Sequence, residues 1–151
     1  MDLFEELRTL VNTLRRAALD YALCGGFALA AHGIVRATED IDLMIDEADL
    51  AKLASAVQPL GFWLQPVPFV FHDGDVVIRR FVKTGAPDFL IIDVLIVTTA
   101  TRPAWDTRRE IDTDFGLVPV VSRAGLIQLK MLRGSGQDLD DIEKLKADEN
   151  E

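Results

Sequence analysis

The stretch YALCGGFALAAHGIVRATEDIDLMID, from Tyr21 to Asp46, carries the features that decide the fold. It begins with a short apolar run, Tyr21 to Cys24, which ends at Gly25-Gly26 and is typical of a buried strand entering a tight turn. Phe27 to His32 then predicts a short, alanine-rich helix, and Ile41 to Ile45 predicts a second strand. The stretch therefore predicts a strand, a glycine turn, a helix and another strand in direct succession.

The glycine pair, Gly25-Gly26, lies where a phosphate group could approach the chain. Glycine permits a positive φ and lets a bulky anion come close to the backbone, and the N-terminus of the helix that follows offers free N–H groups. Two glycines alone usually mark only a turn, and the third glycine of the dinucleotide-binding fingerprint does not follow. The pair indicates phosphate binding only together with other features.

Two aspartates lie at the start of the second predicted strand. Asp40 and Asp42 are two residues apart, and side chains at that spacing on a strand point to the same face. Two carboxylates side by side in half-buried surroundings repel each other and resist the loss of solvent. A divalent cation with oxygen ligands compensates such a pair, although an Asp-x-Asp sequence alone is more often a solvated strand end.

A third aspartate, Asp93, is surrounded by apolar residues in the run from Phe89 to Val97. An isolated carboxylate in a core strand is costly unless it has a partner, and Arg79 or Arg80 on an adjacent strand could be that partner. If the strand lies beside the first two aspartates instead, three carboxylates converge and can hold two cations that bind a triphosphate. The joint presence of all three features in this order favours the metal site.

The remaining pattern mixes helices and strands without an internal repeat. Strands are predicted for Phe62 to Leu64, Val76 to Val82, Phe89 to Val97 and Leu117 to Val121, and helices for Phe4 to Ala18, Glu47 to Leu60, Pro103 to Ile111, Ser122 (as the cap) to Arg133, and from Asp138 onward. Because the middle strands follow one another closely, the pattern favours an α+β fold, with a mixed sheet and helices packed on it. We expect a single domain over residues 1–151, with residues 143–151 as a fraying tail.

Composition narrows the classes of function. The 151 residues carry a net charge of −9, from 16 basic and 25 acidic residues, which disfavours strong nonspecific binding to nucleic acids but leaves room for a locally recruited cation. The single cysteine, Cys24, excludes an internal disulfide and a thiolate zinc site. The N-terminus lacks the pattern of a signal peptide and no apolar run is long enough for a membrane span, so we expect a cytoplasmic protein.

The order of Gly25-Gly26, thirteen intervening residues, Asp40-Ile-Asp42 and Asp93 resembles the signature of the DNA polymerase β-like nucleotidyltransferase superfamily. The run Arg36-Ala-Thr38-Glu-Asp40-Ile-Asp42 is similar to the Arg-x-Thr-x-Asp-Ile-Asp run of minimal bacterial members related to AbiEii-type toxins. This resemblance implies a nucleotidyltransferase fold.

The later part of the chain also resembles these relatives. Leu126-Ile-Gln-Leu-Lys130 and Asp138-Leu-Asp-Asp141-Ile correspond to a lysine followed by an Asp-Leu-x-Asp-Ile segment in relatives. One departure is Gln137, at a position where relatives often have a basic residue.

The resemblance also implies roles for individual residues. Asp40, Asp42 and Asp93 would ligate two Mg²⁺ or Mn²⁺ ions, and Asp93 would help to activate the acceptor hydroxyl. Residues near the phosphates of a nucleoside triphosphate would be Gly25, Gly26, Arg36, Thr38 and Lys130. Asp138 or Asp141 would orient Lys130 or serve as an accessory acid.

Two hypotheses follow. The first is an enzyme that transfers a nucleoside monophosphate from a nucleoside triphosphate to a hydroxyl of an acceptor RNA or protein; by resemblance, its setting would be a toxin–antitoxin or phage-defence module with a cognate antitoxin. The second is a catalytically silent module of the same fold, which binds nucleotide or metal and acts through a partner protein. The three carboxylates favour the enzyme.

Overall fold

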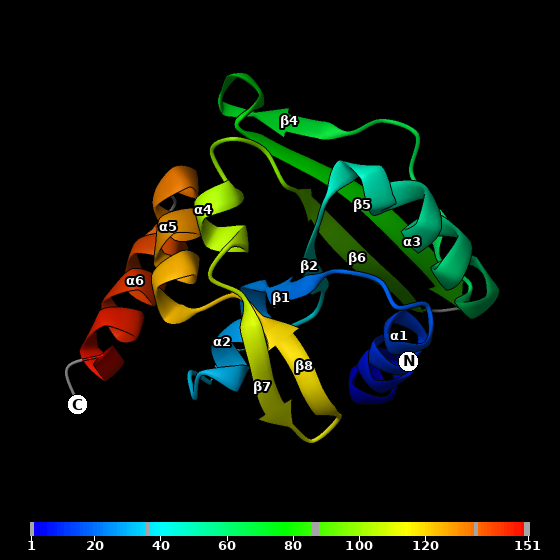
Figure 1. Ribbon diagram of the computed structural model, residues 1–151, viewed down its shortest axis with the longest axis horizontal. Helices are drawn as coiled ribbons and strands as arrows, with labels where there is room; N and C mark the ends of the chain where they lie inside the picture. Colours follow the sequence, from blue (N-terminus) through cyan, green and yellow to red (C-terminus); the bar gives the residue numbers. More distant parts are fainter. Residues whose placement is uncertain (1, 36, 86–87, 135, 150–151) are drawn as a thin grey trace.

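One mixed sheet organises the structure, a computed structural model that describes residues 2–35, 37–85, 88–134 and 136–149 (Figure 1). Its strands are β1 (Ala22–Cys24), β2 (Ile41–Ile45), β3 (Trp63–Leu64), β4 (Phe69–Phe71), β5 (Val76–Gly85), β6 (Asp88–Ile96), β7 (Arg109–Thr113) and β8 (Gly116–Val120). Their order across the sheet is β3-β5-β6-β2-β1-β8-β7, with β4 also paired to β5. The predicted α+β class, with a mixed sheet, is confirmed.

Most of the helices form two groups that pack against this sheet. The helices are α1 (Leu3–Arg16), α2 (Gly25–Ala31), α3 (Leu50–Val57), α4 (Arg102–Trp105), α5 (Arg123–Arg133) and α6 (Gly136–Glu149), with single 3₁₀ turns at Glu47–Asp49, Gln58–Leu60 and His72–Gly74. In Figure 1, α1 and α3 lie together on the right of the view, and α4, α5 and α6 lie together on the left. Among the described helices, none is long and apolar enough to cross a membrane.

The helix α1 shows how the sequence covers one face of the sheet. The Asp2 carboxylate accepts hydrogen bonds from the N–H groups of Phe4 and Glu5 and so caps the first turn. The apolar residues recur at helical spacing, and Leu7, Leu10, Val11 and Leu14 are all buried in the core. From the sheet, alternate residues of β6 meet this core, namely Leu90, Ile92, Val94 and Ile96. The other alternate residues of β6, which include Asp93, therefore belong to the opposite face.

The predicted helix from Pro103 to Ile111 is wrong beyond its first turn. The helix α4 ends at Trp105, and the Thr107 hydroxyl donates to the carbonyl oxygen of Ala104 just after it. Residues 109–113 form β7 instead, which pairs residue by residue with β8 in an antiparallel hairpin. This pairing, made with a strand that lies further along the chain, outweighs the local helical pattern.

The strand β4 was not predicted. Its residues Phe69, Val70 and Phe71 are all exposed, so they lack the alternation of a half-buried strand. The strand exists because the turn at His72–Gly74, in which His72 and Asp73 both have positive φ, folds it back onto the start of β5. The predicted strand Ile41 to Ile45 appears with the same bounds, and the other predicted strands appear with shifts at their ends. The last helix begins at Gly136 instead of Asp138.

Candidate active site

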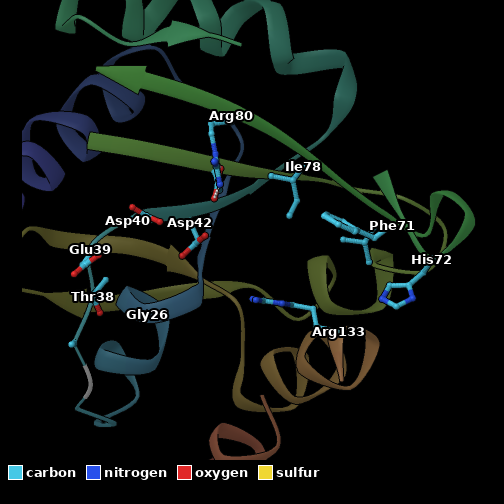
Figure 2. A pocket seen from close by; sticks show the side chains of 13 residues that line it. Gly26, Thr38, Glu39, Asp40, Asp42, Phe71, His72, Ile78, Arg80 and Arg133 are labelled. Atoms are coloured by element: carbon cyan, nitrogen blue, oxygen red, sulfur yellow. Dashed lines mark hydrogen bonds and ion pairs between the residues drawn. The ribbon is translucent and has the colours of Figure 1, made fainter. Parts of the chain in front are cut away.

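The strands β2 and β6 bring two of the predicted aspartates together. They run parallel, and Asp42 and Asp93 are partners in their register. Neighbouring strands lie about 4.8 Å apart, so the two carboxylates leave the sheet side by side. Asp40 lies just before β2, and all three aspartates line the same cavity (Figure 2).

The turn between β1 and α2 lies directly against Asp42. A Cβ atom added at Gly25 would come within 2.2 Å of the Asp42 Oδ2 atom, and Gly25 has a φ of +66°. A side chain is therefore excluded both by the space that the carboxylate occupies and by the backbone conformation. The glycine allows Asp42 to sit at the end of β1, where Cys24 is its register partner.

Gly26 has a different neighbour. A Cβ atom there would come within 2.5 Å of the Thr38 Oγ1 atom, so the absence of a side chain lets the segment before β2 pack closely onto α2. Gly26 and Thr38 both line the cavity of the three aspartates. Arg36, the other residue predicted in this segment, lies outside the described residues.

Crowding of the carboxylates changes their acidity. Burial, together with the charges of Asp93 and Asp40, raises the pKa of Asp42 to about 7. Burial and the charge of Asp93 also raise the pKa of Asp40. The shifts have the sign expected for acids that lack enough positive charge nearby, and a bound cation would reverse them.

Arg80 provides part of that positive charge. On β5 it is the register partner of Asp93, and its Nε and Nη2 atoms donate to the two carboxylate oxygens of Asp93 at 2.8 and 3.0 Å. The guanidinium group also lies 4.9 Å from the centre of the Phe69 ring. Of the two arginines that the sequence offered as partners of Asp93, the structure selects Arg80, because Arg79 belongs to the other face of β5.

The pair does not use all the acceptor capacity of Asp93. An ionised carboxylate has about four lone-pair sites, and a bidentate arginine occupies one on each oxygen. The remaining sites can still face a cation bound between Asp93 and Asp42.

A second charged cluster joins α5 to α6. Lys130 Nζ lies 3.2 Å from Asp138 Oδ1 and 3.1 Å from Asp141 Oδ2, and all three residues are buried. The sequence predicted that Asp138 or Asp141 would orient Lys130, and both contact it. Lys130 also lines a small cavity beneath Cys24, Gly25 and Asp42, so this cluster borders the aspartate site.

Arg133 is a cavity residue that the sequence reasoning did not single out. It lies one turn after Lys130 on α5 and extends into the cavity opposite Asp42 (Figure 2). Its Nε atom is 3.4 Å from Asp138 Oδ2, and its side chain is 61% exposed. The spacing of three residues from Lys130 on a predicted helix was the signal that could have identified it.

The donor set of the cavity suits a divalent cation. The cavity measures about 700 Å³, and its described lining includes four acids, Glu39, Asp40, Asp42 and Asp93, against two arginines, Arg80 and Arg133. Hard cations prefer such carboxylate oxygens, and an acidic cavity accepts a triphosphate only with cations present. Among the described residues, no group of three or more His, Cys, Asp or Glu side chains is arranged as a metal site in this structure.

Comparison with protein families gives a match over most of the chain. The family described as nucleotidyl transferase AbiEii toxin, type IV toxin–antitoxin system, matches residues 8–132. That range contains the three aspartates, both glycines, Lys130 and all of α5 except its last residue, Arg133. No curated protein sequence matches the chain.

Solved structures resemble the fold at low sequence identity. A protein of Thermotoga maritima described as a candidate nucleotidyltransferase has a TM-score of 0.65 and 14% identity, over 93% of this chain and 90% of that one. The lincomycin-bound lincosamide antibiotic adenylyltransferase LnuA has a TM-score of 0.63 and 18% identity, over 94% of this chain and 95% of that one. ANT(2")-Ia in complex with adenylyl-2"-tobramycin has a TM-score of 0.61 and 14% identity, over 94% of this chain and 91% of that one. These similarities establish a shared fold.

Proposed function

The chain belongs to the family of AbiEii nucleotidyl transferase toxins, and from that premise we propose that it moves a nucleoside monophosphate from a nucleoside triphosphate to a hydroxyl of a macromolecular acceptor. The observation that carries the proposal is the juxtaposition of Asp42 and Asp93 on adjacent strands, with Asp40 in the same cavity and Gly25 directly against Asp42. We propose further that residues 1–151 work as one nucleotidyltransferase domain.

The aspartates would hold the metal and accept the proton. Asp40, Asp42 and Asp93 would ligate Mg²⁺ or Mn²⁺, which when bound neutralises charge on the triphosphate and on the leaving pyrophosphate. The acceptor hydroxyl oxygen forms a bond to the α-phosphorus as the bond from that phosphorus to pyrophosphate breaks. The hydroxyl proton passes to the Asp93 carboxylate, which keeps lone pairs free beside Arg80.

The phosphates would lie between the glycine turn and α5. Gly26 and Thr38 line the cavity on one side and Arg133 on the other, and Lys130 and Gly25 both line the small adjoining cavity. We assign Gly25, Gly26, Arg36, Thr38, Lys130 and Arg133 to the triphosphate. Asp138 and Asp141 then act as positioning residues, because they hold the Lys130 ammonium group.

The biological setting follows from the family. A toxin of a type IV system works beside an antitoxin, so we propose a cognate antitoxin as partner, and the cytoplasm, where nucleoside triphosphates are available, as the location. One similar fold is described with an adenylylated aminoglycoside, which supports transfer of a nucleotidyl group by this architecture.

A second candidate is a module that binds nucleotide or metal without turnover. The bidentate Arg80–Asp93 pair favours it, because the arginine already occupies an acceptor site on each oxygen of the Asp93 carboxylate. Presence of all three aspartates in one cavity favours the enzyme.

Labelling distinguishes the two. The protein is incubated with each α-labelled nucleoside triphosphate, Mg²⁺ or Mn²⁺ and whole-cell extract, and the labelled macromolecule is identified. Asp93→Asn should eliminate labelling and retain triphosphate binding, whereas the exposed Asp112→Asn should behave as wild type. If the wild type labels nothing with any nucleotide and either metal, the binding module becomes the better assignment.

A further inference from the structure

Large exposed apolar side chains are concentrated on one part of the sheet. Of the eleven such residues found among the described ones, six lie in β3, in the segment after it, in β4 or at the start of β6: Trp63, Val67, Phe69, Val70, Phe71 and Phe89. Scattered single residues of this kind need no explanation, but a contiguous group usually marks a binding surface. Val70 belongs to the opposite face of β4 from Phe69 and Phe71, so we refer to the other five residues as the apolar patch.

Three residues of this patch, Val67, Phe69 and Phe89, line a groove of about 550 Å³. Pro66, Val67 and Phe69 line one side, and the outward-facing residues of β5 and β6 line the other, namely Val82, Thr84, Phe89 and Ile91. Arg80 is the only charged residue in its described lining.

The groove adjoins the aspartate cavity. Arg80 lines both spaces, and its guanidinium group lies over the Phe69 ring while it holds Asp93. Ile91 lies two residues before Asp93 on β6 and so shares its face of the sheet. A molecule that fills the groove therefore ends next to the carboxylate assigned as the proton acceptor.

The chemistry of the groove argues against a nucleic acid. A phosphate backbone needs unpaired lysine or arginine side chains along its path. In the described lining the sole cation, Arg80, is already paired with Asp93, and the chain as a whole carries a net charge of −9. Apolar side chains bind apolar side chains, and they gain by removal of that surface from water.

The flanking strands favour an extended polypeptide. β3 is an edge of the sheet, and β4 pairs with β5 alone, so in the described sheet each has an outer edge that pairs with no further strand. Edge strands of this kind bind extended segments through backbone hydrogen bonds, with pockets for alternate side chains.

We propose that the groove is the acceptor subsite, and that it takes a polypeptide segment in which a serine, threonine or tyrosine is flanked by apolar side chains. This proposal rests on the proposed transferase function. The side-chain hydroxyl oxygen bonds to the α-phosphorus, pyrophosphate leaves with the electron pair of the broken bond, and the proton goes to Asp93. The products are a phosphodiester on the polypeptide and free pyrophosphate.

Binding tests the subsite without turnover. Fluorescent short peptides with a central Ser, Thr or Tyr between Leu, Val or Phe residues, and a mixed-sequence RNA of similar size, are titrated with the full chain. Val67 and Phe89 have 71% and 65% of their surface exposed, so the double variant Val67→Ser, Phe89→Ser should fold. It should weaken peptide binding by about ten-fold or more. Leu117→Ser, at an exposed apolar residue on β8, is the matched control and should bind as wild type.

Labelling supplies the second measurement. Label transferred in cell extract should be sensitive to protease and resistant to ribonuclease, and should fall in the groove variant while ATP, GTP, CTP and UTP binding stays unchanged. Ribonuclease-sensitive label, absent peptide binding, or equal binding in the groove and control variants would overturn the subsite. The subsite would also be overturned if sedimentation showed that the wild type is a dimer and that the groove variant is a monomer. Failure of all labelling refutes the transferase, and the peptide titration still decides the groove.

Discussion

Two clusters of acids lie next to each other in this protein, and they are compensated in opposite ways. Around Lys130, two buried aspartates, Asp138 and Asp141, share one buried ammonium group at 3.1–3.2 Å, and Arg133 Nε lies 3.4 Å from Asp138 Oδ2 as a second cation. Around Asp42, the described carboxylates outnumber the cations, and Arg80 binds only Asp93. The first cluster is complete within the protein, whereas the second has capacity for a cation from solution.

The comparison separates charges that are balanced within the folded protein from charges that are not. Ion pairs that are already formed in the folded protein hold elements together, here α5 and α6. Carboxylates that lack such partners raise the free energy of the folded state, as the pKa of about 7 at Asp42 indicates, and gain from a ligand. The two clusters should therefore respond in opposite directions when a charge is removed.

The largest effect is expected at Lys130. Lys130→Met removes the ammonium group that both buried acids contact, and the loss of one partner of a buried pair costs about 3–5 kcal/mol. Urea unfolding of the metal-free protein measures this loss. Lys144→Met, at an exposed position on the adjoining helix α6, should change stability by less than about 0.5 kcal/mol. A loss below about 1 kcal/mol in Lys130→Met would remove the distinction between the clusters.

Metal should stabilise only the aspartate site. Mn²⁺ at a hundred times its dissociation constant should raise the free energy of unfolding by about 2.7 kcal/mol, by mass action. Asp42→Asn should abolish the increase, because it removes the ligand between Gly25 and Asp93. Thermal melts with and without Mn²⁺ provide the measurement. An equal shift in wild type and variant would mean that the metal binds elsewhere.

Removal of charge at Asp42 should stabilise the metal-free protein. At pH 8 the Asp42 carboxylate is ionised against its neighbours, so Asp42→Asn is expected to raise the free energy of unfolding by about 2 kcal/mol. Asp112→Asn on β7 is the control, since its carboxylate is exposed. Destabilisation by Asp42→Asn would contradict the picture of an uncompensated cluster.

The same variant has a pH signature. Because the pKa of Asp42 is raised to about 7, the folded state binds a proton that the unfolded state releases at the ordinary pKa near 4. Stability from this group is present at low pH and is lost as the pH rises from about 4 to 7. The advantage of Asp42→Asn should grow across this window and level off above it.

The smallest effect concerns Arg80. Arg80→Gln removes a cation that competes for Asp93, so the affinity for Mn²⁺ should rise about ten-fold, while the loss of a partly exposed pair costs about 1 kcal/mol. Calorimetric titration with Mn²⁺ measures the affinity, and Arg79→Gln, on the other face of β5, should leave it unchanged. Weaker binding in Arg80→Gln would show that the arginine supports the metal site.

The three aspartates of the site could be predicted because each one is unusual among its neighbours in the sequence. Asp40 and Asp42 flank one strand residue, and Asp93 is a charge within an apolar run, so each residue is unusual in its own surroundings. The glycine turn was predicted as well, but for phosphate access. The structure adds a different reason for each glycine, which is contact with Asp42 for Gly25 and with Thr38 for Gly26.

The remaining features depend on contacts between distant segments. The choice between Arg79 and Arg80 depends on the register of β5 against β6, which the sequence leaves open. The pairing of β7 with β8 replaces a predicted helix, and β4 carries no alternation because all its residues are exposed. Arg133 lines the cavity only because the fold brings the end of α5 close to the aspartates of β2 and β6. Local patterns do not determine such tertiary placements.

The strand β1 has a consequence for how the protein reaches its native state. It is three residues long and lies between β2 and β8, so Leu23 pairs with Leu43 on one side and with Val120 on the other. Pairings between residues this far apart in sequence require closure of a long loop and form slowly. Gly25 follows β1 directly, so the turn against Asp42 is fixed only when β1 has paired with β2. We therefore expect the candidate active site to form late in folding.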